Sequence, residues 1–466
     1  MIQKINWLNI ANKNNRFIVQ LMNISVGTLL CGQFGFRVAA YFINGIRPSF
    51  PFWATLYICS MIICAIYLFK QKKLLYIRYI FFVYIIIYSL IYSDGNYQYF
   101  KNITIYCAIP YICGTIIGKY ISNIFFKIIL IYSLIYIAVI ALQFQINPHV
   151  FYSDRLFIFE PKGWDRYGGD PTGIYLGFNF GCSLIIISSL FFSSKLRIKI
   201  ILNYFYTAII LFILLSYCSR SAIIGSYIGL IFIYICQIFI DKKIDLKKLL
   251  FIIACSLLII FNITNQRAQF LSQISDHWKN LNYLITTDEI KKDYSQLIEA
   301  KGLIVLEVKN SKKYSDSRLE AESIHCIKNC DSVGARIVLY REAVRIFFTS
   351  PITGVGPGGY AKLYCGDYDT FASPHSLFLQ VLAEYGLIGF VLLIINLIML
   401  PISFIRHQRS RIAILKLSKV RLLIAMWLFF LINELLSGNI YYGYHFFLIS
   451  GILISIIYNL RDYKNE

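Results

Sequence analysis

The chain has 466 residues, of which 58% are hydrophobic and only 15% are charged, and its mean hydropathy is +0.62. Soluble globular domains usually carry about 25% charged residues, so this composition excludes a protein built from soluble domains. Apolar runs of about 20 residues recur along the sequence, and each is long enough to cross a hydrocarbon core of ~30 Å. The sequence therefore predicts an all-α polytopic membrane protein.

The apolar runs predict about 12 transmembrane helices. In chain order they lie near residues 17–40, 52–69, 74–92, 100–118, 121–142, 173–193, 199–217, 221–240, 249–264, 376–402, 420–437 and 440–459. Three regions follow from this order. Residues 1–264 carry the first nine helices with a loop at 143–172, residues 265–375 form one long loop, and residues 376–466 carry the last three helices.

The formal net charge of +21 raises the question of nucleic-acid binding. Most Lys and Arg residues of the short connecting segments fall in every second loop along the chain. The two chain ends belong to this same Lys- and Arg-rich set. Short loops rich in Lys and Arg stay on the cytoplasmic side. We therefore expect a membrane protein with both termini in the cytoplasm, the two long loops outside it, and no nucleic-acid partner. The short cytoplasmic loops leave no room for a nucleotide-binding domain, so we expect chemistry without ATP.

The long loop at 265–375 begins with a polar and apolar alternation. Apolar residues recur about every 3.6 positions over 267–287, which predicts an amphipathic helix, lying on the membrane or packed on the rest of the loop. Cys326, Cys330 and Cys365 share this loop, and a disulfide between two of them is left open. A single C-x₃-C pair without a second ligand pair argues against zinc, and we expect no metal site.

A second helix is predicted from about 332 to 348, and it carries three arginines. Arg336 falls at one edge of its apolar stripe, while Arg341 and Arg345 lie four residues apart beyond the other edge. Three cations on a short extracytoplasmic helix favour an anionic ligand. A solvated face in contact with lipid headgroups is the competing interpretation for each of them.

The residues after this helix combine a glycine-rich turn with a histidine. Gly354 and Gly356 belong to a run that fits G-x-G-x-x-G, but no strand precedes it, so a tight turn is predicted rather than a dinucleotide site. His375 follows Pro374 at the start of a long apolar helix. A lone histidine is often structural, but here it lies at the predicted outer membrane boundary in the same loop as three arginines.

These motifs together resemble the bacterial O-antigen ligase and O-antigen polymerase superfamily. The resemblance is carried by Arg336, by Pro351-x-x-Gly354-x-Gly356, and by Pro374-His375-Ser376-x₉-Gly386-x-x-Gly389. Ser219-Arg220-Ser221 lies at the outer junction of two spans, where that family has a functional arginine. Arg166-Tyr-Gly-Gly-Asp-Pro171 is similar to the family's Arg-x-x-Gly-x-x-x-Pro-Asn turn, with a shorter spacing and Thr172 in place of Asn.

The resemblance implies a glycosyltransferase that acts on lipid-linked glycans. The donor would be a glycan on undecaprenyl diphosphate at the outer face of the plasma membrane, and an acceptor sugar hydroxyl would attack its anomeric carbon. His375 would act as base or orient the acceptor, and Arg220 and Arg336 would stabilise the leaving diphosphate. Arg166, Arg341, Arg345, Gly354 and Gly356 would contribute to substrate binding. No D-x-D or similar carboxylate cluster accompanies them, so we expect a metal-independent reaction without a cofactor.

Alternatives differ in acceptor or in class. A ligase passes the glycan to lipid A–core, a polymerase passes it to a second lipid-linked repeat unit, and a protein-glycosylating relative would share the signature. The His-Ser-x₉-Gly-x-x-Gly pattern favours the ligase slightly. A transporter or flippase for lipid-linked glycans is the more remote alternative. Arg37, Arg78 and Glu434 are candidate deep charges for it, but no pair of interrupted spans recurs in two halves.

Overall fold

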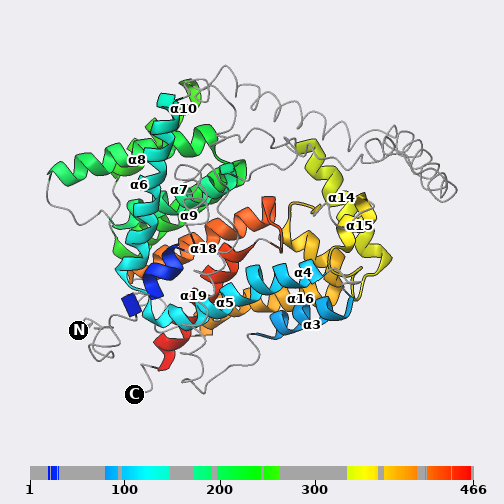
Figure 1. Ribbon diagram of the computed structural model, residues 1–466. Helices are drawn as coiled ribbons and strands as arrows, with labels where there is room; N and C mark the ends of the chain where they lie inside the picture. Colours follow the sequence, from blue (N-terminus) through cyan, green and yellow to red (C-terminus); the bar gives the residue numbers. More distant parts are fainter. Residues whose placement is uncertain are drawn as a thin grey trace.

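The computed structural model shows an all-helical protein (Figure 1). It describes residues 79–92, 97–146, 172–190, 197–242, 246–262, 333–365, 372–406, 417–441 and 443–462, with residue 415 and most of 19–30. Within these ranges every regular element is a helix, as the composition predicts.

The helices keep the labels of Figure 1. In chain order they are α3 (Ile80–Tyr92), α4 (Tyr97–Ile103), the π-helix η2 (Thr104–Ala108), α5 (Ile109–Ile117), the 3₁₀-helix η3 (Gly118–Tyr120), α6 (Asn123–Ile146), α7 (Thr172–Leu190), α8 (Arg197–Tyr217), α9 (Arg220–Cys236), the π-helix η6 (Gln237–Asp241), α10 (Leu246–Asn262), α14 (Val333–Thr349), α15 (Gly359–Cys365), α16 (Leu377–Arg406), α18 (Ser418–Ser437) and α19 (Tyr444–Asp462).

Six helical stretches in the described part are long and apolar enough to cross a membrane. They are Gln98–Ile117, Asn123–Leu142, Ile200–Tyr217, Arg220–Asp241, Leu377–Leu397 and Ser418–Ser437, and three shorter apolar helices cover Ile80–Tyr92, Leu176–Ser189 and Tyr444–Ile457. The chain is thus a multi-pass membrane protein. The predicted total of 12 spans is not confirmed: most of 17–40 and all of 52–69 lie outside the described residues, and the predicted span 249–264 falls on the 17-residue α10.

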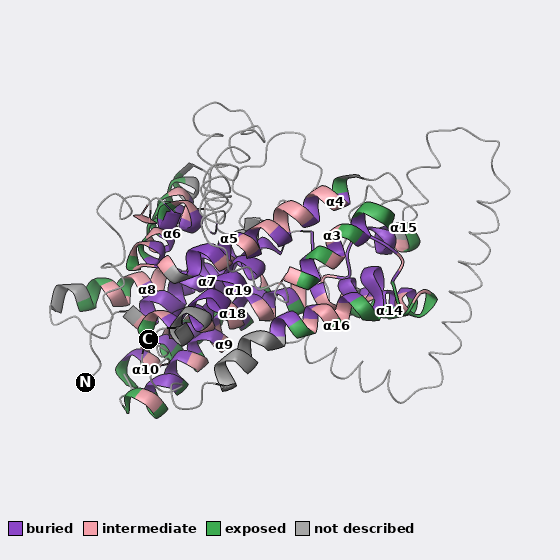
Figure 2. Cartoon of the chain, turned by 90° about the horizontal axis from the view of Figure 1, so that it is seen from below, coloured by how far each residue is buried: buried purple, intermediate pink, exposed green. Residues whose placement is uncertain are grey.

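Glycines allow the central helices to approach closely. A Cβ placed on Gly114 of α5 would lie 2.9 Å from Ile452 N of α19, and one on Gly451 of α19 would lie 2.9 Å from Thr115 N. Small residues at helix crossings let backbones pack directly in a lipid environment, where apolar burial gives no driving force. The buried residues gather where α7, α9, α18 and α19 meet (Figure 2).

The same close packing fixes the register of α9 against α18. A Cβ on Gly225 would lie 2.8 Å from Phe429 O, and one on Gly229 would lie 3.0 Å from Ala425 O. A later residue of α9 thus contacts an earlier residue of α18, so the two helices are antiparallel. At their other ends Asp241 forms an ion pair with Arg421. The N-terminus of α9 therefore lies beside the C-terminus of α18.

A second, smaller core joins α14 and α15 to the first turns of α16. It consists of Leu339, Ala343, Ile346, Tyr360 and Ala383. Because Ala383 belongs to a candidate membrane span, this core fastens the α14–α15 unit to the end of that span. The predicted helix at 332–348 is confirmed as α14, one residue later at each end.

Helix α16 is broken at Gly386, whose φ of 63° and ψ of −164° are non-helical. The loop that follows α14 pairs with the break through backbone hydrogen bonds. Leu387 N–H donates to Pro351 O (2.8 Å), Ile388 N–H to Ile352 O (3.2 Å), and Gly356 N–H to Glu384 O (3.0 Å). Polar backbone groups within a membrane must be satisfied by the protein itself, and this loop supplies their partners.

Replacing Gly386 with alanine should destabilise the protein. A Cβ at this position would lie 2.5 Å from Gly354 N. The alanine would also have to adopt a positive φ, which costs free energy for any residue with a side chain. We expect a loss of about 1–3 kcal/mol, measured as a lower thermal-unfolding midpoint in detergent. The control is Leu387→Ala at the exposed neighbouring position, which should change the midpoint much less. Equal midpoints for Gly386→Ala and the unmodified chain would contradict the importance of the break.

Candidate functional site

Arg336 lies on α14 and reaches the C-terminal end of α18. Its Nη1 donates a hydrogen bond to Leu436 O at 2.8 Å. The last carbonyls of a helix lack partners within the helix and carry its partial negative charge, so a cation there is favourable. The guanidinium also neighbours Tyr340: burial raises the pKa of Tyr340, and the charge of Arg336 partly opposes that shift. Arg336 is therefore held in place by the protein.

Arg220 is the first residue of α9. Ser219 caps this helix, because its hydroxyl accepts a hydrogen bond from Ala222 N–H at 3.3 Å. Arg220 is exposed. A cation at the positive end of a helix dipole is unfavourable by itself, and an anion bound there would offset it. Because α9 and α18 are antiparallel, Arg220 lies at the same end of the helix pair as Leu436.

His375 precedes α16 and adopts a left-handed backbone conformation with φ of 52°. Residues other than glycine rarely adopt a positive φ, and those that do are concentrated at functional sites. The side chain is partly exposed, between the buried Pro374 and the buried Ser376. Ser376 O accepts the hydrogen bond from Gln380 N–H at 2.9 Å, so α16 begins directly after the histidine.

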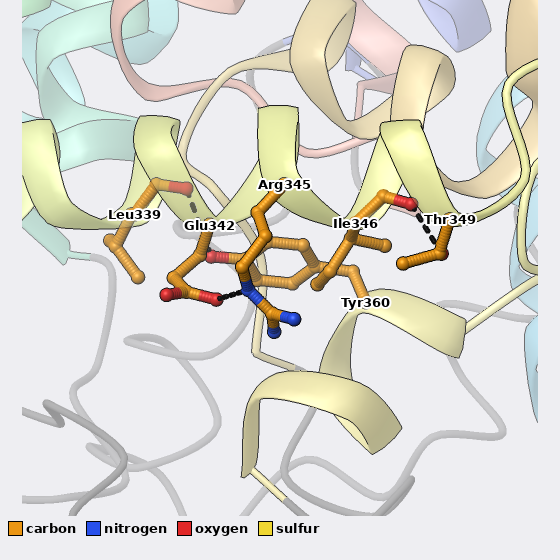
Figure 3. A network of polar contacts seen from close by, with 6 residues as sticks. All are labelled: Leu339, Glu342, Arg345, Ile346, Thr349 and Tyr360. Carbon is orange, nitrogen blue, oxygen red and sulfur yellow. Dashed lines mark hydrogen bonds and ion pairs between the residues drawn. The ribbon is translucent and has the colours of Figure 1, made fainter. Parts of the chain in front are cut away.

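Arg341 and Arg345 differ in their surroundings on α14. Arg345 Nε lies 2.7 Å from Glu342 Oε2, an ion pair between residues one turn apart (Figure 3). The Arg345 side chain is 56% exposed, whereas that of Glu342 is 11% exposed. Arg341 is exposed. An anionic ligand of Arg345 would compete with the Glu342 carboxylate, and contact of Arg345 with substrate stays a prediction.

The glycine turn predicted at Gly354 and Gly356 is confirmed, with φ values of 79° and 90°. Their amides, however, are used within the protein: Gly354 N–H donates to Ser350 O and Gly356 N–H to Glu384 O. The two glycines shape the loop that pairs with α16. Their contact with substrate stays a prediction.

Several predicted features lie outside the described residues. They are Arg166, Cys326, Cys330 and the amphipathic segment 267–287. Among the described residues, no group of three or more His, Cys, Asp or Glu side chains could hold a metal ion.

The structure reveals buried polar residues that the sequence did not single out as site residues. Gln380 and Glu384 of α16 are fully buried, and both contact the turn between α18 and α19. Tyr441, 2% exposed, belongs to that turn, and Glu434 is buried just before it. A carboxylate inside an apolar run is a signal readable from sequence, because such groups are costly in a membrane and usually functional. Nothing local in the sequence shows that Glu384 and Tyr441 meet.

These contacts bring the three leading candidates to one side of the helices. Arg336 binds the end of α18, and Arg220 lies beside that end. His375 lies two residues before the helix whose Gln380 contacts the turn after α18. Arginines bind doubly charged anions and a histidine can transfer a proton, so these helix ends carry the residue types that such chemistry needs.

Comparison with known proteins assigns part of the chain to a family. Residues 205–394 match the family model described as O-antigen ligase, so this part of the chain carries a domain of that family. The matched segment extends from α8 into α16 and contains Arg220, Arg336 and His375. A search of curated proteins found no match to the chain.

Arg220→Gln should weaken the binding of inorganic pyrophosphate to the full chain in detergent. Removing an exposed guanidinium at a helix N-terminus should raise the Kd about tenfold, which corresponds to about 1.4 kcal/mol. Isothermal titration at low ionic strength measures it. Arg345→Gln is the matched control, because Glu342 already pairs with that arginine, and it should change Kd less than about threefold. Equal losses in the two variants would contradict the assignment of Arg220.

Proposed function

We propose that this chain, whose residues 205–394 carry an O-antigen ligase family domain, transfers a glycan from undecaprenyl diphosphate to an acceptor sugar hydroxyl. The observation that carries the proposal is that the matched segment contains Arg220, Arg336 and His375, whose helix ends meet on one side of the helices. Family domains of this kind occur in O-antigen ligases and polymerases. Both enzymes act on lipid-linked glycans.

The reaction exchanges one bond for another at the anomeric carbon. The acceptor oxygen forms a bond to this carbon, the bond from the carbon to the diphosphate oxygen breaks, and undecaprenyl diphosphate leaves with the bonding electrons. Negative charge grows on the diphosphate as it leaves. Fixed guanidinium groups stabilise such charge through paired, charge-assisted hydrogen bonds. Arg220 and Arg336 supply this charge, with Arg341 and Arg166 as further contacts to the substrate.

The acceptor hydroxyl must lose its proton as it attacks. His375 takes this proton or orients the hydroxyl, since an imidazole titrates near neutral pH. Assistance by a general base contributes about 10²–10⁴ in rate. The strained backbone of His375 and its partial exposure support a role at the reacting centre rather than in the core.

The reaction takes place on the extracytoplasmic side of the inner membrane, with both termini in the cytoplasm. Two observations support this orientation. Lys and Arg of the short loops accumulate on the opposite side. The residues that carry the chemistry lie at the ends of α9, α16 and α18 that this topology places outside. The regions 1–264, 265–375 and 376–466 then serve as helical scaffold, outer loop and closing helices.

The acceptor distinguishes a ligase from a polymerase. The sequence His375-Ser376-x₉-Gly386-x-x-Gly389 favours the ligase slightly, with lipid A–core as acceptor. A polymerase would use a second lipid-linked repeat unit. The broken helix α16 and the buried Glu384 and Glu434 keep a flippase as a second candidate function, because transporters use interrupted helices with buried charges.

Reconstitution of the purified chain into liposomes with undecaprenyl-diphosphate glycan tests the proposal. We expect product with lipid A–core, and a ladder of longer lipid-linked glycans if the second lipid-linked unit is the acceptor instead. Mass spectrometry of the extracted lipids identifies either product. No product with either acceptor, together with movement of the donor between leaflets, would favour the flippase.

Within this assay, His375→Ala should lower transfer by about 10²–10⁴, and Arg336→Ala should abolish it. Membrane insertion should be unchanged, as judged by the amount of chain extracted from membranes and by its elution in gel filtration. Near-normal transfer in both variants would overturn the site assignment. Leu387→Ala, at an exposed position outside the named site residues, is the control and should retain most of the activity.

A further inference from the structure

Helix α16 presents two polar side chains, one turn apart, to the interior of the protein. Gln380 and Glu384 are both 0% exposed, and both belong to the candidate span Leu377–Leu397. Burying an amide and a carboxylate in such surroundings is costly unless they are hydrogen-bonded. Their partners therefore indicate what these residues are for.

Both side chains hold the turn that joins α18 to α19. Ile440 N–H donates to Gln380 Oε1 at 3.0 Å, and the hydroxyl of Tyr441 donates to Glu384 Oε2. The same hydroxyl accepts a hydrogen bond from Gly358 N–H at 2.8 Å. The hydroxyl of Tyr441 thus joins the α18–α19 turn to α16 and to the loop between α14 and α15, which contains Gly358. Glu384 is further faced by Gln380 and by the N–H groups of Gly358 and Tyr360.

This turn begins directly after the carbonyl that holds Arg336. Leu436 lies in the last turn of α18, and its oxygen accepts the hydrogen bond from Arg336 Nη1 at 2.8 Å. Helix α14, which carries Arg336, is itself packed on α16 through Leu339 and Ala383. The position of the guanidinium is thus determined from two directions, and both lead to the first two turns of α16.

We propose that Glu384, Gln380 and Tyr441 are positioning residues for the transfer reaction. They fasten the end of α18 to the helix that follows His375, and so they set the distance between the Arg336 guanidinium and the imidazole. This inference rests on the function proposed above. A displacement of about 1 Å between groups that act together can cost about 100-fold in rate, so a buried fastening of this kind affects turnover directly.

Two buried tyrosines allow a matched test. Tyr441→Phe removes the hydroxyl that joins Glu384 to Gly358. Tyr111→Phe removes a hydroxyl that accepts a hydrogen bond from Asn396 Nδ2 at 3.3 Å; Tyr111 is equally buried, but this contact joins α5 to a later part of α16. In the reconstituted assay with the full chain, Tyr441→Phe should lower kcat about 10- to 100-fold and leave KM for the acceptor within about twofold. Tyr111→Phe should retain kcat within about threefold.

Glu384 allows a rescue experiment. Glu384→Gln keeps a side-chain oxygen that can accept from Tyr441, whereas Glu384→Leu removes it. We expect kcat of Glu384→Gln within about fivefold of the unmodified chain and a loss of about 100-fold or more for Glu384→Leu. A kcat for Glu384→Gln as low as that for Glu384→Leu would overturn the positioning role, since it would show that the charge and not the hydrogen bond matters.

Coupling to Arg336 separates positioning from a general loss of structure. If Tyr441 acts through Arg336, adding Tyr441→Phe to an Arg336→Lys variant should lower kcat by less than about threefold further, because the precise placement is already lost. If the loss of kcat in the double variant equals the product of the losses in the two single variants, the inference is overturned.

The same assay gives different results if the positioning role is wrong and if the proposed function is wrong. An active unmodified chain with equal kcat for Tyr441→Phe and Tyr111→Phe would overturn the positioning role alone. An unmodified chain that forms no product with either acceptor would overturn the proposed function and the positioning role with it.

Discussion

The arrangement of the site depends on one constraint, the need to satisfy backbone polar groups where a membrane helix is interrupted. Helix α16 loses its regular hydrogen bonds at Gly386, and lipid cannot replace them. The Pro351–Gly356 segment does so from outside the helix. This pairing brings the C-terminal end of α14 to α16, and the small core between the two helices holds the rest of α14 in place. Arg336 is positioned as a consequence.

Helix ends determine the electrostatics of the same region. The N-termini of α9 and α16 and the C-terminus of α18 lie on one side of the protein, and Arg336 neutralises a carbonyl of α18. Arg220 is the first residue of α9, so its positive charge adds to the positive partial charge at this end of the helix. Arg336 is thus hydrogen-bonded to the end of α18, and Arg220 is exposed. If the proposed donor binds here, its diphosphate meets one arginine held against a helix end and one exposed arginine.

Much of the fold follows from local sequence. The apolar runs and the spacing of apolar residues predict where the helices lie. The end of α14 follows from Pro351 and the glycines after it. The ion pair of Glu342 with Arg345 is also readable, since residues three apart share a helix face. The break at Gly386 is not, because an apolar run with two glycines has the same pattern as a continuous span. The contacts of Glu384 with Tyr441 and of Arg336 with Leu436 join residues 57 and 100 positions apart, which no local pattern encodes.

The pairing of α16 with the segment before it has a consequence for biosynthesis. The Pro351–Gly356 segment precedes α16 in the chain, so it leaves the ribosome first and is available when α16 enters the bilayer. Until the two meet, the amides of Leu387 and Ile388 lack their acceptors in a hydrocarbon environment. Insertion of α16 and docking of the preceding segment are therefore coupled, and a change that keeps this segment from docking would leave a later helix unable to settle in the membrane.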